Sequence, residues 1–301
     1  MADVTDAAFR FIIAKYGKPD VMWTEFVSAD GLCSEGREAL LHNLRFDESE
    51  RPIVAQFFGA TPEHFYRCAM LAQELGFDGI DVNMGCPEKN VVKQGAGAAL
   101  MKNPALAGRI IEETKRGAGP LPVSVKTRIG FNIKEESSWI PVLLEAEPAC
   151  IIVHGRTKKE MSLPPADWEA IGRVAELAKR FGSSSEKTLI LGNGDVTDLK
   201  DAAEKAARYE LDGVMIGRGI FGNPWLFAGL SPSIEEKLRV MVEHTLLFEK
   251  LFKDIKSFDV MKKHYKAYVN GFRGAKELRA RLMEAENAEE VENIVENFER
   301  R

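Results

Sequence analysis

Polar side chains that can bind a ligand or transfer a proton follow short apolar segments at seven places in the sequence. They include Glu25, Gln56, Asn83, Cys86, Lys126, Arg128, His154, Asn193, Asp195 and Arg218. In a barrel of parallel strands the carboxyl ends of all the strands meet on one face, and ligands bind there. The repeated pattern therefore predicts one ligand site that is built from the ends of several strands.

Two of these places are rich in glycine. Residues 192–195 read Gly-Asn-Gly-Asp, and residues 217–219 read Gly-Arg-Gly. Glycine lets backbone N–H groups approach an anion closely, and barrels often bind a phosphate after their last two strands. Arg218 would add a charge-assisted hydrogen bond. We therefore predict a phosphate site here, with tight turns alone as the alternative explanation.

Three of the side chains suit chemistry as well as binding. Lys126 ends an apolar segment, where an ammonium group is costly unless it meets an anion. His154 ends another segment and is expected to face the pocket, although a lone histidine is often a satisfied core residue. Cys86 lies between Gly85 and Pro87, and it can attack as a thiolate or donate a proton as a neutral thiol.

The other cysteines, Cys33, Cys68 and Cys150, are expected to be inert. The absence of any Cys-x-x-Cys pair from the sequence argues against a structural metal site and against a disulfide framework. The N-terminus resembles no signal peptide, and no apolar run is long enough to cross a membrane. We therefore expect a cytoplasmic protein that binds neither a metal nor a membrane.

The segments that position these residues alternate between strands and helices. The expected strands are residues 21–24, 53–57, 80–83, 123–127, 151–154, 189–192 and 214–217, and the expected helices include residues 6–16, 64–74, 103–116, 167–181 and 198–209. Apolar strands separated by helices indicate a parallel sheet. An eighth strand before the first helix would close a (β/α)8 TIM barrel. We predict this α/β fold with its first strand truncated at Met1.

The pattern is helical from the turn at residues 231–233 to the end. We therefore predict a barrel domain at residues 1–230 and a helical domain at residues 231–301. The net charge of −5 is not typical of a nucleic-acid-binding protein. Between Lys250 and Arg281, however, ten Lys or Arg stand against three Asp or Glu.

This basic block, residues 250–281, favours contact with a phosphate backbone. Tyr265, Tyr268 and Phe272 are interleaved with its cations, so we interpret the block as a platform for RNA. The alternative is a solvated helix face whose aromatic side chains pack in a helical core.

Seven motifs together resemble one enzyme family, the tRNA-dihydrouridine synthases. They are Met-Ala-Asp-Val-Thr-Asp at residues 1–6, Val-Ala-Gln-Phe-Phe-Gly at 54–59, Asp-Val-Asn-Met-Gly-Cys-Pro at 81–87, Val-Lys-Thr-Arg-Ile-Gly at 125–130, Val-His-Gly-Arg-Thr at 153–157, Gly-Asn-Gly-Asp-Val at 192–196 and Gly-Arg-Gly at 217–219. Met-Lys-Lys-His-Tyr-Lys-Ala-Tyr at 261–268 resembles the helical domain of that family. The resemblance covers essentially the whole chain, and residues 83–87 are its most specific part.

The resemblance implies an FMN-bearing barrel that reduces the C5=C6 bond of uridines in tRNA. FMN would bind through Met1, Gln56, Lys126, His154, Asn193, Gly194, Asp195, Gly217 and Arg218. NADPH or NADH would reduce the flavin, and Cys86 would be the general acid. Asn83 and Arg128 would meet the substrate, and Lys262, Lys263, Lys266 and Arg279 would hold the tRNA. The protein is expected to be a monomer.

Two other interpretations remain at this stage. One is an FMN barrel that acts on a free pyrimidine, like a dihydroorotate dehydrogenase; a basic helical domain argues against it. The other is an inactive RNA-binding protein with the same fold, which the presence of Cys86, Lys126 and His154 disfavours. The family usually has a short apolar strand before residue 1, so a longer upstream start is expected to bind FMN more tightly than this form.

Overall fold

The computed structural model describes Met1, residues 3–181 and residues 187–300. Tertiary contacts divide the chain into two compact units. The barrel unit comprises Val21–Arg45 and Arg51–Gly217, and the helical unit comprises Met1–Asp20, Phe46–Glu50 and Arg218–Arg301. This division differs from the boundary predicted at residues 230 and 231, because two N-terminal segments group with the C-terminal helices. The functional domains at 1–230 and 231–301 stay a prediction.

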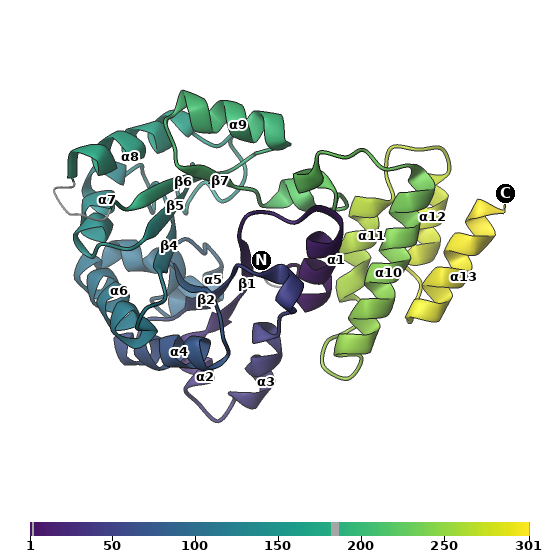
Figure 1. Ribbon diagram of the computed structural model, residues 1–301, viewed down its shortest axis with the longest axis horizontal. Coiled ribbons are helices and arrows are strands. Elements are labelled where there is room, and N and C mark those ends of the chain that lie inside the picture. The colour runs from purple at the N-terminus through teal and green to yellow at the C-terminus, as the bar shows by residue number, and fades with distance from the viewer. Residues whose placement is uncertain (2, 182–186, 301) are drawn as a thin grey trace. The chain divides into compact units, whose positions relative to one another are not determined.

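The barrel unit is built on a curled sheet in which each strand pairs in parallel with the next one in sequence (Figure 1). The strands are β1 (Met22–Ser28), β2 (Ile53–Phe58), β3 (Gly79–Asn83), β4 (Val123–Arg128), β5 (Cys150–His154), β6 (Leu189–Asn193) and β7 (Gly213–Met215). All seven strands that the sequence predicts are present, and the TIM-barrel-like fold is confirmed. Within the described residues, β1 and β7 are the two edges of the sheet.

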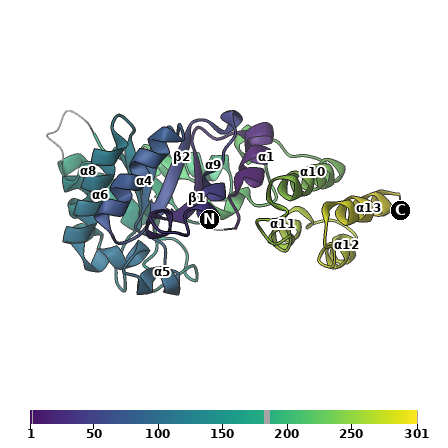
Figure 2. The same cartoon turned by 90° about the horizontal axis from the view of Figure 1, so that it is seen from below.

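Helices cover the outer face of this sheet (Figure 1). The helices of the barrel unit are α2 (Ala29–Leu32), α3 (Glu38–Leu41), α4 (Pro62–Glu74), α5 (Lys89–Lys93), α6 (Pro104–Ala118), α7 (Glu136–Glu145), α8 (Trp168–Phe181) and α9 (Leu199–Arg208). In α6 the Asn103 side chain accepts a hydrogen bond from the Leu106 N–H and so caps the first turn. A Cβ at Gly117 would lie 2.3 Å from the Tyr66 carbonyl oxygen of α4. Glycine there allows the two helices to lie side by side, as both views show (Figure 2).

The helical unit contains α1 (Ala7–Gly17), α10 (Ile234–Phe252), α11 (Val260–Tyr268), α12 (Ala275–Leu282) and α13 (Ala288–Glu299). α1 belongs to it because Ala8 and Ile12 are buried in the same apolar cluster as Met241 of α10. A buried ion pair, 2.6 Å between Arg10 and Glu50, ties residues 46–50 to α1. The sequence pattern did not reveal this grouping, because it joins segments that lie more than 200 residues apart.

The core of the helical unit takes up aromatic side chains that the sequence interpretation had assigned to an RNA platform. Tyr265 and Tyr268 are fully buried, and Phe272 is half-buried against Phe298, with ring centroids 6.0 Å apart. The interpretation of these rings as a platform for RNA is therefore wrong for both tyrosines, because neither ring is exposed. Helical spacing alone does not distinguish a buried stripe from an exposed one, and here the apolar contacts of the rings decide.

Two general features bear on function. Within the described residues, no helix is long and apolar enough to cross a membrane. Nor do those residues bring together three or more His, Cys, Asp or Glu side chains that could hold a metal ion.

Candidate functional site

A chain of buried hydrogen bonds runs across β2, β3 and β4. Ser124 Oγ donates to Asp81 Oδ1 at 2.6 Å, and Gln56 Nε2 donates to Asp81 Oδ2 at 2.7 Å. Asn83 Nδ2 then donates to Gln56 Oε1 at 3.1 Å. The Asn83 Oδ1 atom accepts from the backbone N–H groups of Gly85, at 3.1 Å, and Cys86, at 2.9 Å. The chain therefore links a buried acid to the loop that carries Cys86.

Asp81 sets the orientation of two amide side chains. An ionised carboxylate only accepts hydrogen bonds, so Gln56 must turn its NH2 group toward Asp81. The Gln56 oxygen then faces Asn83, which must offer its own NH2 group and keep its oxygen for the Cys86 loop. Asp81 is completely buried, and burial raises the pKa of its carboxyl group to about 6, against the lowering effects of Ser124 and Gln56.

Arg128 also stabilises the Cys86 loop by hydrogen bonds to backbone carbonyl oxygens. This side chain is buried, and it donates to the carbonyl oxygens of Gly85 at 2.8 Å, Thr157 at 3.1 Å and Met161 at 2.9 Å. Cys86 itself closes the loop, because its carbonyl oxygen accepts from the Ala98 N–H at 3.0 Å. Arg128 therefore stabilises the backbone around the Cys86 loop. Its expected contact with RNA stays a prediction.

The Cys86 thiol is half-buried. Burial raises its pKa, and the nearby Glu88 backbone and Arg128 lower it only in part. The thiol is therefore neutral near pH 7 and suits a proton donor better than a nucleophile. Burial also raises the pKa of Cys68, and it raises that of Cys150 to about 12, which agrees with their expected inertness.

Lys126 lies next to this network on β4, where it pairs in register with Asn83 of β3. Its ammonium group is half-buried, and among the described residues it has no hydrogen bond or ion pair. Burial, together with the charge of Arg128, lowers the pKa of Lys126 to about 7, while Asp81 opposes the change. An ammonium group in this state is stabilised by any anion that comes within reach.

His154 and residues 193–195 occupy the ends of β5 and β6. The His154 Nε2 atom lies 3.2 Å from Nη1 of Arg156, and a Cβ at Gly194 would lie 2.9 Å from Cδ2 of the His154 ring. Gly194 has φ +126°, so this position excludes a side chain for two reasons. Asp195 binds the Arg156 guanidinium and accepts from the Ala166 N–H at 2.9 Å, so its carboxylate has a structural role.

The remaining predicted cofactor residues are divided between the units. Asn193 donates from Nδ2 to the Met215 carbonyl oxygen at 2.8 Å, which joins the ends of β6 and β7. A Cβ at Gly217 would meet nothing within 4 Å, so the backbone here is open to a ligand. Met1 and Arg218 belong to the helical unit.

The four cations predicted to hold the tRNA lie in the helical unit, on α11 and α12. Lys266 is exposed and Lys263 is half-buried, whereas Lys262 pairs with Asp259 at 2.5 Å. Arg279 donates to the Val269 carbonyl oxygen at 2.6 Å. Within the part of the chain that the structure describes, Lys263 and Lys266 have no side-chain partner, whereas the other two predicted cations do.

Two functional features were missed in the sequence. Asp81 was read as part of a strand, although an acid within the apolar run Gly-Ile-Asp-Val-Asn was a visible signal. The proximity of Cys33 to Cys68, which helps to raise the pKa of Cys68, had no such signal because the residues are far apart in sequence.

Comparison with known proteins agrees with this arrangement. The dihydrouridine synthase family model matches residues 1–301. A protein of Staphylococcus aureus (strain MRSA252) named "Probable tRNA-dihydrouridine synthase" is 41% identical over 304 residues, which cover 99% of this chain and 91% of that protein. "Probable tRNA-dihydrouridine synthase 2" of Bacillus subtilis (strain 168) is 38% identical over 306 residues, 100% of this chain and 93% of that one.

A solved structure supports the fold. Morphinone reductase superposes with a TM-score of 0.53 at 12% identity, over 75% of this chain and 81% of the other. This likeness concerns the architecture of the barrel alone. The match to the family model over the whole length, together with relatives at about 40% identity, places the chain in the dihydrouridine synthase family.

Proposed function

We propose that this protein is a tRNA-dihydrouridine synthase that reduces the C5=C6 bond of uridines in tRNA, with FMN as its bound cofactor and NADPH or NADH as the reductant. The observation that carries the proposal is the presence of two groups on neighbouring strands. A neutral thiol, Cys86, lies in the loop that follows β3, and Lys126, whose ammonium group has no partner among the described residues, lies on the adjacent β4. A proton donor and an anion-stabilising group are the two protein functions that this reduction requires.

The residues present fit a flavin. Lys126 lacks an anionic partner, Gln56 has a second amide hydrogen to offer, and the backbone at Gly194 and Gly217 can approach a phosphate. We propose that these residues hold FMN together with His154, Asn193 and Asp195; the FMN contacts expected of Met1 and Arg218 stay predictions. Bound FMN would supply the hydride that C6 of the uracil ring accepts.

Cys86 supplies the second half of the reaction. Addition of hydride at C6 leaves negative charge on C5 and the conjugated carbonyl, and C5 must then take a proton. The Cys86 thiol gives up this proton and becomes a thiolate, which solvent protonates before the next turnover. Arg128 stabilises that thiolate, because it already lowers the pKa of Cys86 against the effect of burial. We propose that Asn83, at the end of β3 before this loop, orients the uracil.

The helical unit provides the RNA-binding part of the proposal. Lys262, Lys263, Lys266 and Arg279 offer cations along α11 and α12, and phosphate contacts of this kind would offset the unstacking that moves a uridine out of the tRNA. The curated relatives are named for tRNA. We also propose that the protein works as a monomer in the cytoplasm.

One experiment tests the assignment. The protein is reconstituted with FMN, reduced without oxygen, and mixed with tRNA that lacks dihydrouridine. Flavin reoxidation and dihydrouridine formation are followed for the wild type, for Cys86→Ala and for the control Cys33→Ala. We expect turnover that Cys86→Ala slows by about 100-fold or more, the scale of general acid catalysis, whereas Cys33→Ala does not. Oxidation by free pyrimidines but not by tRNA would refute the proposal.

A further inference from the structure

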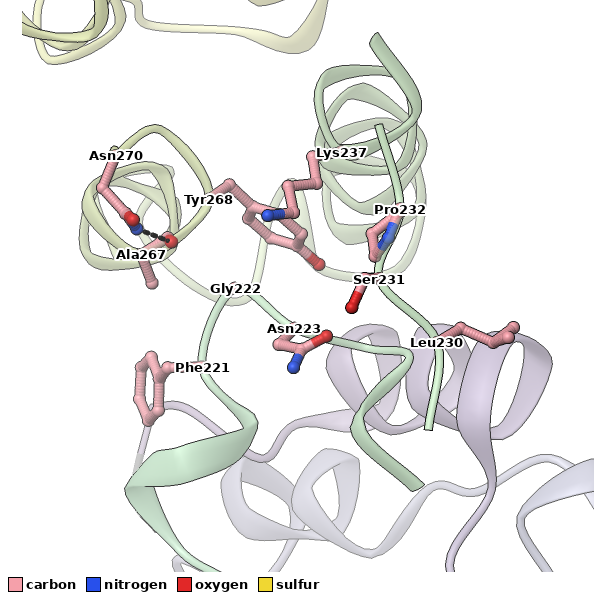
Figure 3. A pocket seen from close by; sticks show the side chains of 10 residues that line it. All are labelled: Phe221, Gly222, Asn223, Leu230, Ser231, Pro232, Lys237, Ala267, Tyr268 and Asn270. Carbon is pink, nitrogen blue, oxygen red and sulfur yellow. Dashed lines mark hydrogen bonds between the residues drawn. The ribbon is translucent and has the colours of Figure 1, made fainter. Parts of the chain in front are cut away.

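A cavity of about 220 Å³ lies within the helical unit (Figure 3). It is lined by residues 221–223, by residues 230–232 before α10, by one side chain of α10 and by the end of α11: Phe221, Gly222, Asn223, Leu230, Ser231, Pro232, Lys237, Ala267, Tyr268 and Asn270. Pockets for whole small-molecule ligands start at about 300 Å³. This cavity therefore suits one chemical group of a larger ligand.

The wall of the cavity is fixed by close backbone packing. Gly222 has φ +66°, and a Cβ there would lie 2.1 Å from the Ala267 carbonyl oxygen. Only glycine lets residues 221–223 lie against the end of α11. On the other side, Asn270 donates to the Ala267 carbonyl oxygen at 2.5 Å, so contacts within the chain fix both walls of the cavity.

Two buried polar atoms in the cavity have no partner within the described residues. They are the hydroxyl group of Tyr268, whose side chain is 1% exposed, and Oδ1 of Asn223. Figure 3 shows both atoms and the Ser231 hydroxyl turned toward the same space. Burial raises the pKa of Tyr268, so its hydroxyl group remains a donor. Unsatisfied buried groups of this kind are costly to leave unpaired, which indicates an external partner.

A cation completes the lining. The Lys237 side chain is half-buried, and among the described residues its ammonium group has no hydrogen bond or ion pair. The neighbouring acid Glu236 forms its ion pair with Arg239, at 3.8 Å. The Lys237 ammonium group is therefore available to bind an anionic ligand. The cavity thus offers a positive charge and two hydroxyl donors beside one acceptor.

We propose that this cavity binds one phosphodiester group of an RNA together with the 2′-hydroxyl of the adjoining ribose. Lys237, Tyr268 and Ser231 donate to the phosphate oxygens. Asn223 Oδ1 accepts from the 2′-hydroxyl, the donor that distinguishes RNA from DNA. Naming RNA as the ligand rests on the proposed function, whereas the oxyanion site rests on the cavity alone.

Binding of an unmodified tRNA transcript at several salt concentrations tests the proposal. Tyr268→Phe removes only the hydroxyl group and should weaken binding about three- to tenfold. Tyr265→Phe is its control, because the Tyr265 hydroxyl faces Thr245 at 3.4 Å in the core of the unit. Lys237→Gln should weaken binding and reduce the slope of log K against log salt by about 1, whereas Lys200→Gln on α9 should do neither.

A second pair of measurements separates the possible ligands. Asn223→Leu should weaken binding of the transcript and leave binding of the DNA of the same sequence unchanged. Inorganic phosphate should raise the melting temperature of the wild type more than that of Tyr268→Phe. These results, in variants that melt normally without phosphate, would support the site.

Three outcomes would overturn it. If phosphate stabilises the protein through Lys237 and Tyr268 but the variants bind tRNA normally, the cavity takes a free phosphate compound. If neither ligand responds to the variants, the cavity holds only water. If the wild type responds to phosphate but binds no tRNA, the proposed function fails while the oxyanion site is retained.

Discussion

Moving the negative charge from Asp81 to residue 56 is a sharp test of the hydrogen-bond chain. Gln56→Glu alone would set a second carboxylate against Asp81, across a contact that is now 2.7 Å. Two charges about 4 Å apart repel by about 4 kcal/mol at an effective dielectric of 20. The pair would instead take up a proton, which at pH 7 costs about 3.7 kcal/mol for a carboxyl group with an ordinary pKa of about 4.3.

Asp81→Asn alone should be mild. The amide that this substitution introduces can offer its oxygen to Gln56 and its NH2 group to Ser124, whose hydroxyl group can accept. The loss of one charged acceptor is worth about 1 kcal/mol. In the double variant Gln56→Glu/Asp81→Asn every donor again meets an acceptor, so its stability should lie within about 1 kcal/mol of the wild type. The coupling between the two changes is therefore about 4 kcal/mol at pH 7.

The proton that the carboxyl pair takes up in Gln56→Glu also sets how the stability of this variant depends on pH. A carboxyl pair with a raised pKa destabilises the folded state above the unfolded pKa of about 4.3, and the cost grows by about 1.4 kcal/mol for each pH unit. The defect of Gln56→Glu should shrink from about 3.7 kcal/mol at pH 7 to about 1 kcal/mol at pH 5.

Urea unfolding followed by tryptophan fluorescence measures these differences, since Trp23, Trp139 and Trp168 lie in the barrel unit. Gln94→Glu, which adds the same charge at an exposed site on that unit, is the control and should change stability by less than about 0.5 kcal/mol. Additive effects of the two substitutions, or a defect of Gln56→Glu that does not change with pH, would refute the role of Asp81 in orienting the amides.

Three other predictions concern the site and the helical core. The alkylation rate of Cys86 should have a pH midpoint above the value of about 8.5 for free cysteine, because burial raises its pKa; a midpoint below about 8.5 would contradict the acid role. Gly194→Ala should abolish FMN binding measured by flavin fluorescence, because a Cβ there would meet the His154 ring at 2.9 Å; normal affinity would remove Gly194 from the proposed site. The buried rings of His244 and His264, with centroids 4.8 Å apart, have no hydrogen-bond partners within the described residues, and burial lowers the pKa of His264 to about 3. A lowered histidine pKa costs no stability above about pH 6.5, so each of these histidines should leave the unfolding free energy unchanged there and lower it by about 1.4 kcal/mol for each pH unit below that value. His264→Phe should lessen this acid sensitivity by one such contribution, and an unchanged slope would refute the cause.

The sequence by itself determined the strands and the place of the site. Apolar runs separated by helices predict parallel strands, and parallel strands in register bring their carboxyl ends to one face. Gln56, Asn83, Lys126 and His154 could therefore be grouped before any coordinates, because each lies at or near the end of such a run. Cys86 could be grouped with them for the same reason, since its loop directly follows β3.

The tertiary structure decided what each of these side chains meets. Asp81, Gln56 and Ser124 come from three different strands, so their hydrogen bonds depend on the register between strands, which no local pattern contains. Arg128 has the same charge whether it faces RNA or three backbone carbonyls, and only the path of the neighbouring loops places it on the carbonyls. Tyr268 has helical spacing in either case; packing buries its ring, and the path of residues 221–223 leaves its hydroxyl group facing a cavity. Local periodicity is a property of neighbouring residues, whereas partners are chosen by contacts between segments that are distant in the chain.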